Sequence, residues 1–190
     1  MSRSRFFLLV ATAATISSFT ASHLSAQGAR MTTGPVIMSG GAAFDVPNVS
    51  FPTPPSTHEY KIVYVVNRGT PDSATTGTNE QLNTVARFLN LHVRNGVPRE
   101  RIHLAAVVHG TGFKDLLTDE EHMKRYGVKN PSGTFVRELL GAGVQLILCG
   151  QTASARAITQ EQLLPGAKIA LSAMTALNAL YAQGYQLNPW

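Results

Sequence analysis

Cysteine is almost absent from this sequence, which has one, Cys149, among 190 residues. A lone cysteine cannot form a disulfide within the chain, so no internal disulfide stabilises the fold. The sequence also lacks an uninterrupted apolar run of about 20 residues, which a membrane-spanning helix needs. Charged residues make up only 14% of the chain. The basic ones are scattered, with no aromatic residues between them, which argues against a nucleic-acid surface.

Motifs of several common enzyme classes are missing as well. The segment after the first predicted strand, 67–72, has no glycine pattern of a nucleotide-binding loop. There is no Gly-x-Ser-x-Gly elbow of serine hydrolases, and no family signature supports cysteine–histidine hydrolysis. Four histidines show no zinc-type spacing with each other or with the cysteine: His58, His92, His103 and His122. The sequence therefore predicts neither a cofactor nor a metal site.

The N-terminus has the layout of a secretory signal peptide. Arg3 and Arg5 precede an apolar stretch, 6–19, and small residues follow up to Ala26. We expect residues 1–26 to be the signal peptide, with cleavage after Ala26, and the mature protein to be periplasmic or secreted. An uncleaved N-terminal anchor is the alternative, and either one puts the folded part outside the cytoplasm.

Removal of 26 of 190 residues leaves 164, a length that suits one domain. The mature chain would keep 14 basic and 11 acidic residues, a net charge of +3. This small charge predicts no nucleic-acid partner, and after signal cleavage no membrane contact.

Residues 27–58 predict an arm that precedes the domain. Five prolines interrupt regular structure there: Pro35, Pro47, Pro52, Pro54 and Pro55. The segment contains too many apolar residues for a purely flexible linker. We therefore expect part of it to lie against the domain or against a neighbouring subunit.

Residues 59–190 alternate between strand and helix patterns. The predicted strands are 60–66, 102–108, 144–148 and 168–171, with an edge strand at 185–187. Helices are predicted between them, three of whose starts carry a capping-box pair: Thr78 with Gln81, Thr118 with Glu121, and Thr159 with Gln162. This alternation predicts a three-layer α/β/α sandwich with a mostly parallel sheet of about five strands.

Chemically useful side chains stand where the predicted strands end. Asn67 and Arg68 follow the first strand, His109 follows the second, and Cys149 follows the third. Sites in such sheets form at the carboxyl ends of strands. Whether these residues converge depends on the strand order, which the sequence does not give.

A thiol at this position has a plausible chemical role. A helix expected to begin near Thr152, together with Arg68 or a protonated His109, would lower the pKa of Cys149. The backbone amides that follow it, Gly150, Gln151 and Thr152, would receive an anion. Such a thiol can accept sulfur as a persulfide or form a mixed disulfide.

Each of these residues also has a plainer interpretation. Cys149 can be an inert core residue or can pair with another molecule. His109 can cap the backbone at a strand end, and Arg68 can be an ordinary surface charge.

Several segments together resemble the DsrE/DsrF-like family, in its exported branch. They are Leu-Ile-Leu-Cys-Gly-Gln-Thr at 146–152, Leu-Leu-Pro-Gly at 163–166 and Gln-Gly-Tyr-Gln-Leu-Asn-Pro-Trp at 183–190, with Val-Val-His-Gly at 107–110 and Gly-Pro-Val-Ile at 34–37. The resemblance implies a three-layer α/β sandwich that forms trimers or hexamers. It also implies a single cysteine that accepts sulfur from a donor protein and passes it to an acceptor protein. That role maps onto Cys149, and the family-like histidine maps onto His109.

Three functions are consistent with these observations. The first is a sulfur carrier that uses Cys149. The second is an oligomeric binding or scaffold module in which Cys149 is only packed. The third is a thiol redox protein or sensor, which would need a resolving thiol from another molecule.

Overall fold

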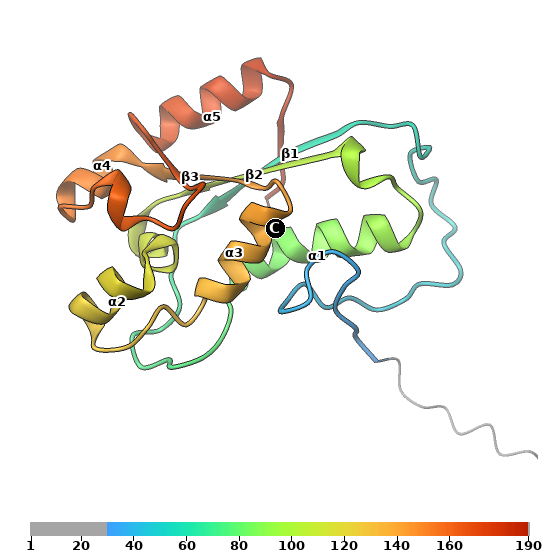
Figure 1. The fold of residues 1–190 in the computed structure, drawn as a ribbon. Coiled ribbons are helices and arrows are strands. Elements are labelled where there is room, and N and C mark those ends of the chain that lie inside the picture. The colour runs from blue at the N-terminus through green and yellow to red at the C-terminus, as the bar shows by residue number, and fades with distance from the viewer. Residues whose placement is uncertain (1–29, 190) are drawn as a thin grey trace, which may run out of the picture.

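The structure is a computed structural model that describes residues 30–189 (Figure 1). The expected signal peptide, 1–26, lies outside these residues. The five strands are β1 (Tyr60–Val66), β2 (Ile102–Val108), β3 (Gln145–Cys149), β4 (Lys168–Ala170) and β5 (Gln186–Leu187). They form one sheet in the order β4-β3-β2-β1-β5, and every neighbouring pair is parallel. The predicted α/β fold with about five strands is confirmed.

Five α-helices connect and cover these strands. They are α1 (Glu80–Arg94), α2 (Asp119–Tyr126), α3 (Gly133–Gly141), α4 (Gly150–Ala155) and α5 (Ala173–Ala182), with short 3-10 helices η1 (Arg99–Arg101), η2 (Gly110–Leu116) and η3 (Gln160–Gln162). Figure 1 shows α5 on one face of the sheet and α1 and α3 on the other. In the described part of the chain, no helix has both the length and the apolar character to cross a bilayer.

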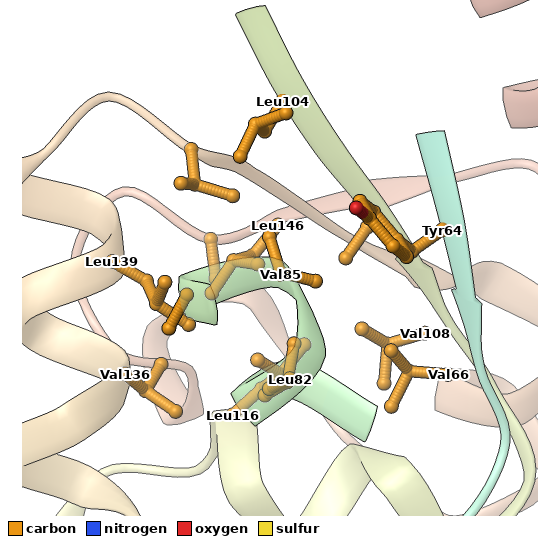
Figure 2. Packing of buried hydrophobic residues seen from close by; sticks show 14 of the residues in the cluster. Tyr64, Val66, Leu82, Val85, Leu104, Val108, Leu116, Val136, Leu139 and Leu146 are labelled. Atoms are coloured by element: carbon orange, nitrogen blue, oxygen red, sulfur yellow. The ribbon is translucent and has the colours of Figure 1, made fainter. Parts of the chain in front are cut away.

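The two faces of the sheet carry side chains of different size. Toward α1 and α3 lie large residues such as Tyr64, Leu104 and Leu146, which pack with the helices in the main core (Figure 2). Toward α5 lie smaller ones, including Val63 and Ala105. Because successive residues of a strand point to opposite faces, each central strand supplies both layers and is mostly apolar.

The start of α1 corrects one expectation. Asn79, and not Thr78, is the N-cap, and its side-chain oxygen accepts from the backbone N–H groups of Gln81 and Leu82. The Gln81 side chain does not return to the cap. Its oxygen accepts from the backbone N–H groups of Asn67 and Arg68, each at 2.9 Å. The expected capping box is therefore wrong, because this glutamine binds the loop after β1.

The other two capping pairs lie at helix starts. Thr118 caps α2 by accepting from the Glu121 N–H, while the Glu121 carboxylate pairs with Arg125 instead of completing the box. Thr159 and Gln162 form a reciprocal capping box at η3. Two of the three pairs thus mark the starts of helical segments correctly.

Residues 32–43 of the arm pack against the domain. Ile37 is fully buried in the main core. The Asn90 carboxamide on α1 accepts from the N–H groups of Val36 and Ile37, and donates to the carbonyl of Ile37 at 2.9 Å. Arg94, one turn further along α1, donates to the carbonyls of residues 32–34. Hydrogen bonds from α1 and the buried side chain of Ile37 thus hold this part of the arm against the domain.

We predict that Asn90→Ala lowers the free energy of unfolding by about 2–4 kcal/mol, because it leaves buried arm amides and carbonyls without partners. Urea unfolding measures this change. The amides of Val36 and Ile37 should also exchange hydrogen faster than in the wild type. Asn95→Ala on the same helix is the control, and should cost no more than about 0.5–1 kcal/mol. Equal losses in both variants would contradict a specific role of Asn90.

Candidate functional site

The pairing of the three central strands aligns their carboxyl ends. Val66 pairs with Val108, and Val108 pairs with Leu148. The residues that follow in the same register are Asn67, His109 and Cys149. Neighbouring strands are about 4.8 Å apart, so the backbone of His109 lies beside that of Cys149 and Asn67 lies one strand further.

Cys149 ends β3 and is the N-cap residue of α4. The helix therefore begins at Gly150, two residues before the expected start near Thr152. A side chain at Gly150 would overlap the carbonyl oxygens of Ala170 and Leu171, at the end of β4. Glycine at this position allows the turn after Cys149 to lie directly against the neighbouring strand end.

The Cys149 thiol is surrounded by hydrogen-bond donors. The side chain is buried, and burial alone raises the pKa of a thiol. Hydrogen bonding from the backbone N–H groups of Thr152, Ala173 and Gln151, and from the Thr152 hydroxyl, outweighs burial and lowers the pKa of Cys149 below its ordinary value. The turn thus favours the thiolate, which is the nucleophilic form.

One of these donors was not expected from the sequence. Ala173 is the first residue of α5 and follows the end of β4, so its N–H reaches Cys149 from a second helix start. Ser172 caps that helix by accepting from the Thr175 N–H. The Ser-x-x-Thr sequence after the fourth predicted strand was the available signal, because β4 ends at the same edge of the sheet as β3.

His109 lies at the start of η2 with an extended backbone. Its N–H donates to the carbonyl of Val66, and its carbonyl accepts from Gly112. The imidazole makes no hydrogen bond to another residue between 30 and 189, so it does not cap the backbone. The half-buried side chain of His109 thus starts from the strand end next to that of Cys149.

Arg68 lies near the start of α1, away from the turn that holds Cys149. Its N–H donates to Gln81, and its carbonyl accepts from Asn79, so its backbone is bound to the start of α1. Arg68 lines a hollow of about 360 Å³ with residues 69–81, and Cys149 does not line it. Asn67 is exposed, and its carbonyl accepts from the Thr111 N–H at 3.0 Å. The expected grouping of Arg68 with the thiol therefore does not follow from these contacts.

A buried carboxylate fixes the loop after β1. Asp115 is fully buried and accepts from the N–H and hydroxyl of Thr70 and from the Asn79 side chain at 2.7 Å. Ser132 shares a hydrogen bond with the same Thr70 hydroxyl. No local sequence pattern predicts this network, because it joins four separate segments. Across residues 30–189, no group of three His, Cys, Asp or Glu side chains could hold a metal ion.

The fold and site together define an all-parallel α/β protein with one thiol, at the carboxyl end of a central strand and beside two helix starts. Comparison with known families gives a more specific assignment. The model of the DsrE/DsrF-like family matches residues 60–189, and the chain belongs to this family.

Two solved structures are similar to this chain. One is MTH1491 from Methanobacterium thermoautotrophicum, described as a protein of unknown function, with 20% identity, 70% of this chain and 100% of that chain covered, and a TM-score of 0.47. The other is the YchN protein from E. coli, with 18% identity, 69% and 99% covered, and a TM-score of 0.44. No curated protein matches the sequence.

We predict that iodoacetamide alkylates Cys149 in the folded protein with a pH midpoint below that of the unfolded chain. Thr152→Val removes a hydroxyl that favours the thiolate, so its midpoint should move up. Thr175→Val is the control, because the Thr175 hydroxyl contacts Ser172. The rate of alkylation measured against pH gives the midpoints of the wild type, of both variants and of the unfolded chain. A folded midpoint at or above the unfolded one would contradict the arrangement.

The lowered pKa also has a consequence for stability. When the folded-state pKa is the lower one, the thiolate stabilises the fold above the unfolded-state pKa, and this contribution is lost as the pH falls through the folded-state pKa. The unfolding free energy of the wild type relative to Cys149→Ala should therefore grow as the pH rises from the folded-state pKa to the unfolded-state pKa, which is about 8.5 for a free cysteine. A constant difference over this range would contradict it.

Proposed function

We propose that this chain is a sulfur carrier in which Cys149 accepts a sulfur atom as a persulfide and passes it to an acceptor thiol. The observation that carries the proposal is the set of N–H and O–H donors that lowers the pKa of a buried thiol. A cysteine that only packs in the core is stabilised by apolar contacts and does not require donors around its sulfur. Membership in the DsrE/DsrF-like family supports the same role, because the resemblance implies a sulfur-accepting cysteine at this position.

The transfer needs no external oxidant or reductant. The Cys149 thiolate attacks the outer sulfur of a donor persulfide, R–S–SH, and a new S–S bond forms. The donor S–S bond breaks, and the donor sulfur leaves with the electron pair as a thiolate. In the second step an acceptor thiolate attacks the outer sulfur of the Cys149 persulfide, which restores the Cys149 thiolate.

In this proposal the other edge residues have distinct roles. The imidazole of His109 donates a hydrogen bond to the sulfur carried on the neighbouring strand end. The backbone amides of Gln151 and Thr152, presented by the turn at Gly150, hold the Cys149 sulfur, which is a thiolate before loading and the inner sulfur of the persulfide afterwards. Arg68 and Asn67 lie toward the α1 side and are left for contacts with a donor or acceptor protein.

The proposal also includes export. Arg3, Arg5, the apolar stretch 6–19 and the small residues up to Ala26 support a signal peptide, and hence a periplasmic or secreted carrier. Its donor and acceptor would then be proteins of the same compartment, in contrast to the cytoplasmic relay members of the family.

An assembly of identical subunits, a trimer or hexamer, is part of the same proposal. A patch on and around α5 exposes large apolar side chains: Leu171, Met174, Tyr181 and Leu187. Leu171 is 75% exposed and Met174 73%. Clusters of this kind on a soluble surface mark interaction sites. Because Ala173 lies between these two residues and donates toward Cys149, a subunit docked there would border the thiol.

We predict that incubation with cysteine persulfide adds one sulfur atom to Cys149. Intact-mass spectrometry followed by peptide mapping detects the added atom and its position. Cys149→Ser should remain unmodified, and thiol reduction should reverse the change. His109→Ala should slow the loading without abolishing it.

The decisive comparison uses the same protein sample. A folded wild type whose thiol reacts with iodoacetamide but gains no sulfur from the persulfide would overturn the carrier function. Under the scaffold alternative, Cys149 would react with iodoacetamide only after unfolding.

We predict that Met174→Lys lowers the molar mass of the assembly toward that of a monomer, because an interface would have to desolvate the new charge. Multi-angle light scattering measures the mass. Met123→Lys is the matched control, since Met123 is exposed on α2, outside the α5 patch, and should leave the mass unchanged. An unchanged mass for both variants would contradict an interface at α5.

A further inference from the structure

A cavity of about 600 Å³ lies near the amino ends of the strands, whereas Cys149 is at a carboxyl end. The arm segment 46–56 forms one side of it. Tyr60, at the amino end of β1, and Leu91, His92 and Asn95, near the end of α1, form the other. Because the strands are parallel, the amino end of β1 and the carboxyl end of β3 are on opposite edges. The cavity is therefore separate from the proposed sulfur site, and its lining does not include Cys149.

Tyr60 and His92 in one wall of the cavity belong to an aromatic cluster that also includes Phe88 and His58. Phe88 and His92 stack with their centroids 3.8 Å apart. Tyr60 meets the edge or face of both, with centroids 4.8 Å from His92 and 5.7 Å from Phe88. His58 adds a perpendicular contact to Tyr60 at 4.7 Å. These mutual contacts fix the rings before any ligand binds.

The opposite wall is mostly apolar and carries no charge. It includes Val46, Val49, Pro54 and Pro55, and none of the residues around the cavity is Asp, Glu, Lys or Arg. Cavities of this size and composition suit small organic molecules. A charged ligand would lose its hydration without gaining an ion pair, so the lining favours a neutral one.

Two polar groups of Tyr60 and His92 have no hydrogen-bond partner among residues 30–189. The Nδ1 atom of His92 is 2.7 Å from the carbonyl oxygen of Phe88. A carbonyl only accepts, so Nδ1 carries the proton and Nε2 is left as an acceptor. Burial lowers the pKa of His92, which keeps the ring neutral. Tyr60 is only 9% exposed, and its hydroxyl has no hydrogen-bond partner within residues 30–189.

We propose that this cavity binds a small, largely apolar molecule that carries a hydroxyl group, such as a phenol or an alcohol. The ligand O–H donates to Nε2 of His92, and its oxygen accepts from the Tyr60 hydroxyl. A hydroxyl satisfies an acceptor and a donor through a single oxygen atom. The apolar body of the ligand replaces water against the valines and prolines of the arm.

We predict that the purified full chain binds 2-naphthol saturably, and more tightly than 2-methoxynaphthalene, which keeps the oxygen acceptor but cannot donate. His92→Phe preserves the stacked ring and removes the acceptor, so it should weaken 2-naphthol about five- to tenfold and leave the ether unchanged. Tyr60→Phe removes only the hydroxyl and should weaken both probes. Isothermal titration calorimetry measures each affinity.

Leu91→Trp is the blocking variant, because it fills the cavity, and it should abolish binding of both probes. Cys149→Ser should bind both as the wild type does, which separates this site from the sulfur chemistry. Circular dichroism establishes that each variant is folded. The proposal is overturned if the folded wild type binds neither probe, if His92→Phe affects both equally, or if Leu91→Trp leaves both affinities unchanged.

Discussion

The candidate site depends on the register of the three central strands. Val66, Val108 and Leu148 are aligned, so the next residues, including His109 and Cys149, lie in one row. A slip by one residue would turn every side chain of a strand to the opposite face. The two faces differ in size, with residues such as Tyr64 toward α1 and residues such as Ala105 toward α5. A slipped strand would therefore put large side chains under α5, and core packing protects the position of the thiol.

Buried polar groups fix the loops at the same edge. Asp115 has no cation among its hydrogen-bond partners within the described residues, and instead receives three hydrogen bonds from Thr70 and Asn79. Burying a carboxylate is costly unless such donors surround it. The network is therefore satisfied only when the loop after β1, the start of α1 and η2 have all taken their final positions. Gln81 adds two bonds to the backbone of that loop. The loop after β1 is thus held in place by Asp115, Asn79 and Gln81, which do not take part in the proposed chemistry.

The strands and most helix starts could be predicted because their signals are local. Apolar runs mark β1 to β3, and Thr118 caps α2 as its sequence indicates. The capping box of Thr78 with Gln81 was wrongly predicted. A glutamine at this position can complete a capping box or bind the loop after β1, and the local sequence does not distinguish the two. The contribution of Ala173 could not be predicted, since it depends on β4 lying beside β3. Whether Arg68 lies with the thiol could not be predicted either, because that depends on the strand order and on the backbone contacts of Arg68 to the start of α1.

Two opposing effects at Cys149 determine what the site can do. Burial disfavours the thiolate, and donors from two helix starts favour it more strongly. Fixed hydrogen-bond donors, rather than a neighbouring cation, lower the pKa of this thiol. The donors stay in contact with the Cys149 sulfur even when the negative charge moves to another atom. An added sulfur atom would carry the charge about 2.05 Å further along the S–S bond, away from the turn. In the proposed carrier, the same backbone groups would hold the inner sulfur while the outer sulfur is presented to a partner. A thiol redox protein with this site would have to take its second thiol from another molecule, because Cys149 is the one cysteine of the sequence.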